Sequence, residues 1–208
     1  VHLGAQAAGN WGGFTLTAGA VFSRHDVELS RSIGGVPGFD QRLDSKYDVK
    51  NRQIYADAGY YPDLGAAEAG PFVQYVNARL SHDPIRESGG SLAGSRDVRT
   101  AKLDIGTAGL RILSRARDAG GAPHWLTANG SIGYRKVWGD KTPLATFTWA
   151  NGTPYTVAGI AGENSAFVAD IGLSAAVTQS LTFQVGYSGE FASRNSNHSA
   201  NARISFRF

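Results

Sequence analysis

The chain contains no cysteine, so it can form neither a disulfide bond nor a thiolate metal site. It also contains no methionine, so Val1 is not a translation start, and we expect the 208 residues to be a processed or excised segment. No apolar run is suited to a transmembrane helix, because the uncharged stretch 142–162 is interrupted by prolines and an asparagine. If the chain crosses a membrane, it must therefore do so as a closed β-barrel, since only helices and barrels satisfy their backbone in lipid.

Charge is scarce as well. Charged residues make up 18% of the sequence, against about a quarter in ordinary soluble domains. The net charge is only +3, and the arginines are scattered along the chain, which argues against a nucleic-acid partner. Glycine (27 residues) and aromatic residues (11%) are abundant. This composition suits a lipid-facing barrel and also a soluble β-sandwich, so it leaves both classes open.

The chain does have a strict alternation of apolar and polar residues. In 199–208 the even positions are Ala200, Ala202, Ile204, Phe206 and Phe208, and every odd position is polar. This pattern predicts a strand with one apolar face, and about ten residues is the length of a tilted strand across a bilayer. The same alternation along the chain predicts about eleven strands: 1–9, 13–29, 46–61, 71–83, 99–114, 125–138, 143–150, 153–160, 165–178, 181–191 and 199–208.

Two segments break the alternation. In 99–114, Leu103 and Ile105 have one parity and Leu110 and Ile112 the other, which would be reconciled by a β-bulge near 106–107. In 71–83, both faces are partly apolar.

The connections between the predicted strands also alternate, in length. Those after residues 9, 61, 150 and 178 are short or moderate, and those after 29, 83 and 191 are longer and polar. Asn151-Gly152 predicts a β-hairpin. Short turns on one side and long loops on the other are typical of outer-membrane barrels, as are girdles of aromatic residues near the strand ends. Candidates for the girdles are Trp11, Phe14, Tyr60, Tyr61, Trp125, Trp138, Trp149 and Tyr187.

Several blocks, in their order along the chain, resemble the C-terminal β-domain of type V autotransporters from Gram-negative bacteria. They are residues 12–20, 24–26, 53–60, 71–76, 86–90, 107–111, 181–189 and 204–208. The resemblance covers nearly the whole chain. It implies an all-β fold, an antiparallel transmembrane β-barrel of the twelve-stranded autotransporter type. Residues 1–208 would form one such domain, with the first strand and the lumenal helix of the family missing.

The resemblance also implies a function. The chain is expected to be an outer-membrane translocator that anchors an autotransporter and helps to export its N-terminal passenger. Its expected partners are outer-membrane lipid, the barrel assembly machinery and its own passenger, with a monomeric barrel and no nucleic acid. Two alternatives stay open, namely another outer-membrane barrel such as a pore or adhesin, and a soluble β-sandwich binding module.

Charged residues of the polar parity are predicted to line the lumen, because an arginine or lysine facing mid-bilayer lipid would cost about 2–4 kcal/mol. They are Asp57, Arg79, Asp104, Arg111, Arg135, Asp170, Glu190, Arg203 and Arg207. The resemblance further implies that Ile204, Phe206 and Phe208 form the C-terminal signal for barrel assembly. We expect no catalytic residue, metal or cofactor, since the five histidines are dispersed and no G-x-S-x-G elbow occurs. Catalytic activity would belong to the passenger.

Overall fold

The computed structural model describes residues 1–35, 40–114, 125–149 and 152–207, and the regular elements in these ranges are β-strands. No helix in these ranges is long and apolar enough to cross a membrane. The strands are β1 (His2–Trp11), β2 (Phe14–Ile33), β3 (Gln41–Tyr60), β4 (Ala67–His82), β5 (Ile85–Arg86), β6 (Gly94–Val98), β7 (Ala101–Ser114), β8 (Leu126–Gly139), β9 (Leu144–Trp149), β10 (Tyr155–Ala158), β11 (Ser165–Ala176), β12 (Leu181–Ala192) and β13 (Ser196–Phe206).

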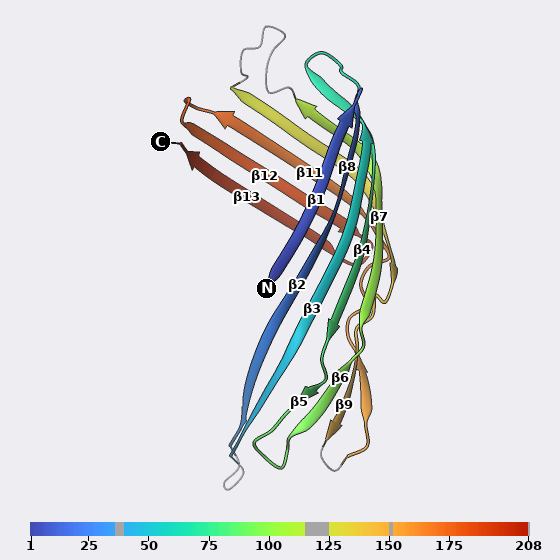
Figure 1. Ribbon diagram of the computed structural model, residues 1–208, viewed down its shortest axis with the longest axis vertical. Helices are drawn as coiled ribbons and strands as arrows, with labels where there is room; N and C mark the ends of the chain where they lie inside the picture. The colour runs from blue at the N-terminus through green and yellow to red at the C-terminus, as the bar shows by residue number, and fades with distance from the viewer. Residues whose placement is uncertain (36–39, 115–124, 150–151, 208) are drawn as a thin grey trace.

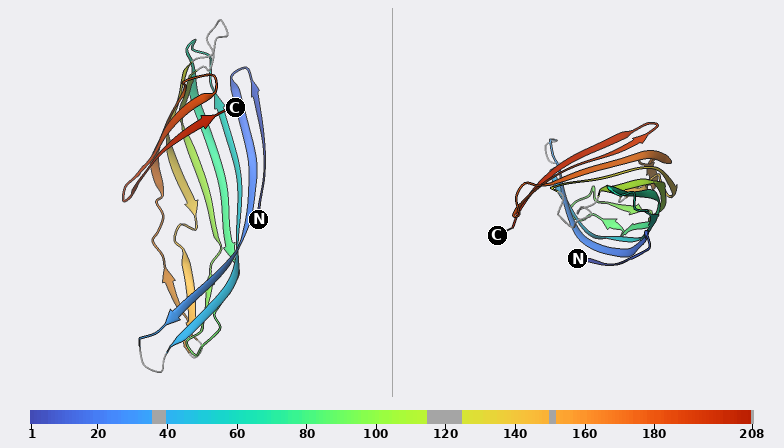
Figure 2. Two further views of the ribbon diagram at one scale, coloured as in Figure 1. Left: turned by 90° about the vertical axis from the view of Figure 1, so that its left-hand side faces the viewer. Right: turned by 90° about the horizontal axis from the view of Figure 1, so that it is seen from above.

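Nine strands form one antiparallel sheet in the order β1-β2-β3-β4-β7-β8-β11-β12-β13. The sheet is strongly curled and follows part of the wall of a cylinder (Figure 2). Within the described residues, β1 and β13 are its two edges. The short turns 12–13, 61–66 and 177–180 lie at one end of the sheet together with the end of β13 (Figure 1).

The other end of the molecule carries a second sheet of four short strands, in the order β10-β9-β6-β5 (Figure 1). Strands β2 and β3 have 20 residues each, about twice the length needed to cross a bilayer, and they project toward this end. A β-bridge joins Asp44 of β3 to Ser88, with two backbone hydrogen bonds of 2.9 Å. We call the far halves of β2 and β3 (residues 24–33 and 41–50) together with β5, β6, β9 and β10 the extension.

All of the predicted strands are present, but two of them belong to a different sheet from the one expected. The predicted strands 143–150 and 153–160 correspond to β9 and β10, which have 6 and 4 residues and are too short to cross a bilayer. They pair with each other and with β6 of the extension. Strands β5 and β6 were not predicted. Asn151, of the predicted Asn151-Gly152 hairpin, lies outside the described residues.

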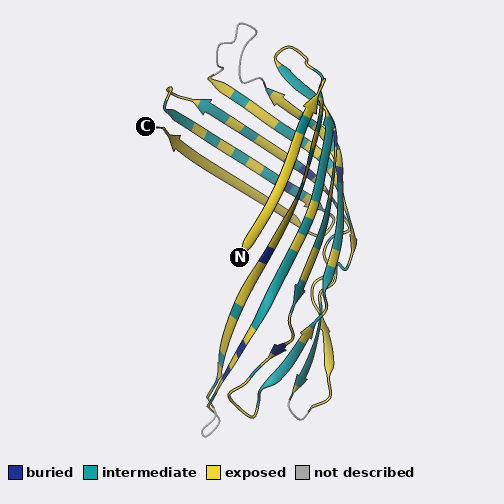
Figure 3. Cartoon of the chain, viewed as in Figure 1, coloured by how far each residue is buried: buried dark blue, intermediate teal, exposed yellow. Residues whose placement is uncertain are grey.

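The two faces of the main sheet differ in chemistry. Directly paired residues lie on the same face, so the register assigns every strand position to one side. One face carries exposed apolar side chains, and alternate residues along the strands differ in burial (Figure 3). This apolar band consists of Phe14, Leu16, Phe22, Ile54, Val73, Leu110, Ile112, Ile132, Phe167, Ile171, Phe183, Val185 and Ile204.

The face opposite the apolar band is the concave one. There, side chains reach one another across an intervening strand, which requires that they converge. The Tyr55 hydroxyl of β3 donates to Gln6 of β1 at 2.8 Å, across β2. Two ion pairs make the same kind of contact across β4 and across β11. The apolar band is therefore on the convex face, from which side chains diverge.

Candidate functional site

The concave face carries seven of the nine charged residues predicted to share one face. Arg111 pairs in register with Ser131, and Ser131 pairs with Asp170. The other members are placed on this face by the same pairing register, or by lying an even number of residues from a position on the same strand that the register places there. The seven are Asp57, Arg111, Arg135, Asp170, Glu190, Arg203 and Arg207. These are the residues that could line a common aqueous surface.

Arg79 and Asp104 lie on the convex face instead, so the prediction that they share a face with the other seven is wrong. Arg79 pairs with Arg52 and Lys102, and Asp104 pairs with Trp138. The error has a physical cause. The register of β7 runs without a break past residues 106–107, so the expected bulge is absent and the apolar residues at 103 and 105 lie on the concave face.

A cluster of four side chains, the wall cluster, crosses three strands on the concave face. The Arg111 guanidinium donates to both carboxylate oxygens of Asp57 at 3.0 Å and to the Tyr61 hydroxyl at 2.8 Å. Its Cζ atom also lies 4.3 Å from the ring centroid of Phe72, which is only 5% exposed. The cluster thus combines a bidentate ion pair with a cation–π contact, and joins β3 to β7 across β4.

Glycines on both sides of Phe72 make room for the wall cluster. Gly59 and Gly109 are its direct partners on β3 and β7. A Cβ atom at Gly59 would lie 2.3 Å from the Tyr61 hydroxyl, and one at Gly109 would lie 2.0 Å from the backbone oxygen of Ile132. Both positions therefore require glycine for close approach rather than for a special backbone angle.

A second ion pair supports the other half of the concave face. Arg135 of β8 donates to Glu190 of β12 at 2.7 Å, across β11. Beneath it, Ala166 is the direct partner of Arg135 and is 4% exposed. Arg203, by contrast, forms no ion pair among the described residues.

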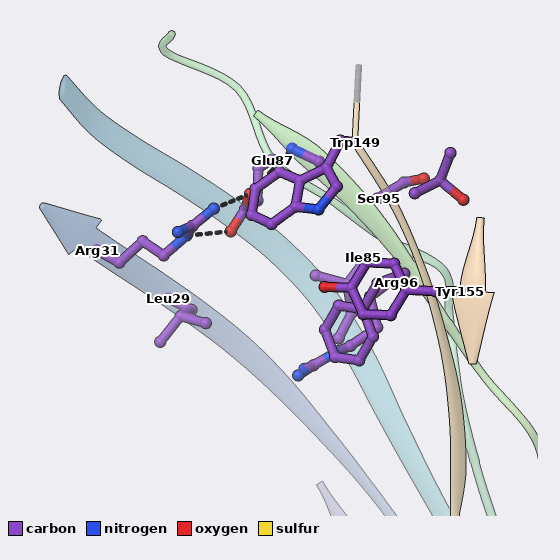
Figure 4. Close-up of a pocket in the computed structure, with 11 residues that line it drawn as sticks. Leu29, Arg31, Ile85, Glu87, Ser95, Arg96, Trp149 and Tyr155 are labelled. Atoms are coloured by element: carbon purple, nitrogen blue, oxygen red, sulfur yellow. Dashed lines mark hydrogen bonds and ion pairs between the residues drawn. The ribbon is translucent and has the colours of Figure 1, made fainter. Parts of the chain in front are cut away.

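The extension forms a partly open cavity of about 290 Å³ (Figure 4). Its walls include the apolar side chains Leu29, Ile85, Phe147, Trp149 and Tyr155. At one side Arg31 of β2 donates to both carboxylate oxygens of Glu87, at 2.6 and 2.7 Å. The backbone N–H of Gly94 adds a third hydrogen bond to Glu87, at 3.0 Å. This carboxylate therefore connects β2 to the second sheet.

The Glu87 carboxylate is expected to make the extension sensitive to acid. Hydrogen bonds from Arg31 and, in smaller part, from Gly94 hold the pKa of Glu87 below its ordinary value, although partial burial opposes this. A lowered folded-state pKa stabilises the fold above the unfolded-state pKa of about 4.3, and this stabilisation is lost as the pH falls through the folded-state value. Because Arg31 is partly exposed, we expect the loss to be only about 1 kcal/mol.

Trp149 can report this transition, because the Arg31 guanidinium lies 5.9 Å from its ring centroid. In a precursor in which Trp149 is the only tryptophan, with Trp11, Trp125, Trp138 and any tryptophan outside residues 1–208 changed to phenylalanine, emission should change reversibly below about pH 4.3. Glu87→Gln should remove this step. An unchanged acid transition in Glu87→Gln would assign it to another group.

Two of the three residues of the predicted assembly signal, Ile204 and Phe206, lie on the convex face of β13. Ile204 pairs with Phe183, and Phe206 pairs with Leu181, and both are more than half exposed. Phe208 lies outside the described residues. The convex face is thus apolar up to the edge strand that ends the chain.

Aromatic side chains gather at the turn end of the convex face, where the Phe14 and Tyr60 ring centroids are 4.4 Å apart. Two of the predicted girdle residues are not on the convex face of the main sheet. Tyr61 is buried in the wall cluster, and Trp149 belongs to the extension. The alternation identified these residues as aromatic strand residues but could not place them relative to a membrane.

No group of three or more His, Asp or Glu side chains within the described ranges is arranged to hold a metal ion. The charged side chains of the concave face bond mainly to one another, as in the wall cluster and the Arg135–Glu190 pair. This arrangement provides a rigid polar surface.

Comparison with known proteins agrees with this architecture. Residues 1–188 match the autotransporter β-domain family. Two extracellular serine proteases of Serratia marcescens are 23% and 22% identical to the chain over 210 residues, covering 100% of the chain. The chain spans 20% of the length of each of these relatives. It therefore belongs to the autotransporter β-domain family and is the non-catalytic translocator, connected to a passenger, in the outer membrane of a Gram-negative bacterium.

Proposed function

We propose that the concave face lines a water-filled lumen through which the passenger crosses the membrane, while the apolar band contacts lipid. The observation that carries the proposal is the separation of the two chemistries by the curled sheet. Large apolar side chains such as Phe167, 67% exposed, cover the convex face, and the paired charges lie on the other. Charges in a hydrated lumen keep their solvation, which they would lose in lipid.

The height of the apolar band supports contact with a bilayer. On β2 the band runs from Phe14 to Phe22, and Arg24 follows on the same face. Eight steps of about 3.4 Å, tilted by about 40°, rise roughly 20 Å, close to the band of about 25 Å typical of outer-membrane barrels.

The remaining roles follow from this arrangement as part of the same proposal. Residues 1–208 act as one barrel domain in which the edges of β1 and β13 are paired when the barrel is closed, since an open edge is not tolerated in lipid. The barrel assembly machinery recognises Ile204, Phe206 and Phe208. The passenger carries any catalytic activity, and the relatives named above suggest a secreted protease.

Cysteine scanning can test the assignment of the two faces, because the chain has no native cysteine. Single cysteines would replace Thr17 and Ser188 on the concave face, and Ala18 and Ala108 on the convex face, in a full-length precursor otherwise free of cysteine. A water-soluble maleimide should label the first pair at least about tenfold faster, because thiols facing lipid are shielded from the reagent. Equal labelling on both faces, or the reverse preference, would refute the proposal.

Passage of the passenger needs its own measurement, because a passive pore would also have a wet lumen. A photoreactive thiol reagent at Thr17→Cys or Ser188→Cys should cross-link to a passenger stalled during export. The same reagent at Ala18→Cys should not. Labelling without cross-linking would indicate a pore that the passenger does not use.

A further inference from the structure

Three cations form a row on the convex face, immediately beyond the apolar band. Arg52 of β3 pairs directly with Arg79 of β4, and Arg79 pairs directly with Lys102 of β7. All three are exposed. Directly opposed Cβ atoms in such a ladder lie about 4.5–5.5 Å apart, and like charges in that position repel one another. We call these residues the cationic row.

No carboxylate among the described residues forms an ion pair with the cationic row. Asp104 is on the same face but accepts hydrogen bonds from Tyr75 at 2.5 Å and Asn77 at 2.8 Å. Asp140 accepts from the backbone N–H of Lys102, at 3.2 Å, rather than from its ammonium group.

Farther toward the extension, by contrast, the cations of the convex face all have acidic partners. Arg24 is bonded to Asp48, Lys46 to Glu28 at 2.6 Å, and Lys50 to Asp83 at 3.3 Å. Lys136 of β8, on the same face, also has no acidic partner among the described residues, but its ammonium group lies 5.9 Å from the Trp138 ring centroid. Within the same residues the cationic row has neither kind of partner, which indicates that an anion from outside the chain compensates it.

That level coincides with the boundary of the apolar band. On β3 the convex positions from Tyr60 to Ile54 are aromatic or apolar, and Arg52 follows. On the band side of the row, Tyr75 and Trp138 form an aromatic layer, with the Trp138 ring lying over Gly106. Aromatic rings at this height are typical of a membrane–water interface, and the next layer outward is that of the lipid headgroups.

Arg79 lies near the end of β4 that leads to β5, and Lys102 near the start of β7, which follows β6, so the row lies toward the extension. The short turns are at the opposite end of these strands (Figure 1). In outer-membrane barrels, the short turns face the periplasm and the long connections face the cell exterior. The row therefore reaches the headgroups of the outer leaflet. This step rests on the proposed contact of the convex face with lipid.

We propose that the cationic row binds the phosphate groups of a phosphorylated lipid in the outer leaflet. Two adjacent guanidinium groups can each donate two hydrogen bonds to phosphate oxygens, and the Lys102 ammonium adds a further charge. A phosphate bound between Arg52 and Arg79 would offset the repulsion between the two guanidinium groups, because its negative charge attracts both of them. The bound lipid would then fix the height of the barrel in the membrane.

The test measures binding of lipid A to the full-length precursor, purified in detergent, by the rise in its unfolding temperature. Diphosphorylated lipid A should stabilise the native protein in a saturable way, and dephosphorylated lipid A should do so much less. The triple variant Arg52→Gln/Arg79→Gln/Lys102→Gln should bind about a hundredfold more weakly, at about fivefold per cation removed. Lys46→Gln is the matched control, because it removes a paired cation from the same face and should leave the affinity unchanged.

Inorganic phosphate is the second ligand in the test and distinguishes a lipid phosphate from a free anion. At equal phosphate concentration it should neither stabilise the protein nor displace lipid A. The proposal would be overturned if free phosphate or dephosphorylated lipid A stabilised the protein as much as diphosphorylated lipid A does. It would also be overturned if diphosphorylated lipid A stabilised the triple variant as much as the unchanged protein. If the triple variant does not fold, the single variant Arg79→Gln decides, since it should weaken binding about fivefold while Lys46→Gln leaves the affinity unchanged. Failure here with normal cysteine labelling of the two faces would refute the lipid site and leave the translocator proposal intact.

Discussion

Deleting Phe208 from the full-length precursor is expected to reduce its assembled outer-membrane form at least about tenfold. The reason is the proposed role of the last strand as the signal that the assembly machinery recognises. Phe206, two residues earlier on the convex face of β13, is 66% exposed and free to be recognised. Assembly is measured as the band that resists SDS and shifts on heating, together with passenger on the cell surface.

Substitutions of matched position separate recognition from general damage to the strand. Phe206→Ser should cause a loss similar to that of the Phe208 deletion. Arg207→Gln and Ser205→Thr replace one polar residue by another at the polar positions of the strand, and both variants should assemble normally. A heat-modifiable band of normal intensity after deletion of Phe208 would contradict the assembly-signal role. Equal losses in all four variants would show that any change to this edge strand is harmful, and would contradict a signal confined to the apolar parity.

The second large effect is expected for Arg111→Ala, which should lower the free energy of unfolding by about 2–3 kcal/mol. Removing one partner of a fully buried ion pair costs about 3–5 kcal/mol, and the value is reduced here because the Arg111 and Asp57 side chains are 27% and 15% exposed. The substitution leaves the Asp57 carboxylate without its bidentate partner and uncovers Phe72. The measurement is urea unfolding of the full-length precursor in detergent micelles.

A double-mutant cycle identifies the pair as the cause. Asp57→Asn alone should also destabilise, and Arg111→Ala/Asp57→Asn should cost less than the sum of the two single effects. Arg203→Ala is the control, since Arg203 is exposed and forms no ion pair among the described residues, and it should change stability by less than about 0.5 kcal/mol. Strict additivity in the cycle would show that the two residues act independently.

The alternation of apolar and polar residues correctly identified the strands of the main sheet, because the two-residue period depends only on local backbone geometry. It also grouped seven of the nine charged residues predicted to share a face on the concave face. It failed in β4 and β7. There the concave face itself contains apolar residues such as Phe72, covered by Arg111, and Leu103, so parity alone could not identify the side of Arg79 and Asp104.

The wall cluster shows the same limit. Nothing in the sequence pairs Asp57 with Arg111, since they are 54 residues apart and on strands that are not neighbours. Only the curl of the sheet, with glycines beside Phe72, brings them together across β4. The charge pattern predicted which residue types would share a face. Which of them pair with one another depends on how tightly the sheet curls.

The sequence by itself determined that this protein is built of antiparallel strands with one apolar face and that it resembles an autotransporter β-domain. Both conclusions depend on short-range periodicity and local motifs. The tertiary structure alone decided that β9 and β10 join β5 and β6 in the extension rather than extend the main sheet. It alone also aligned Arg52, Arg79 and Lys102 in a single row. Register and curvature, which determine the partners in a sheet, depend on contacts between residues far apart in the chain. The alternation along one strand does not indicate which strand pairs with it.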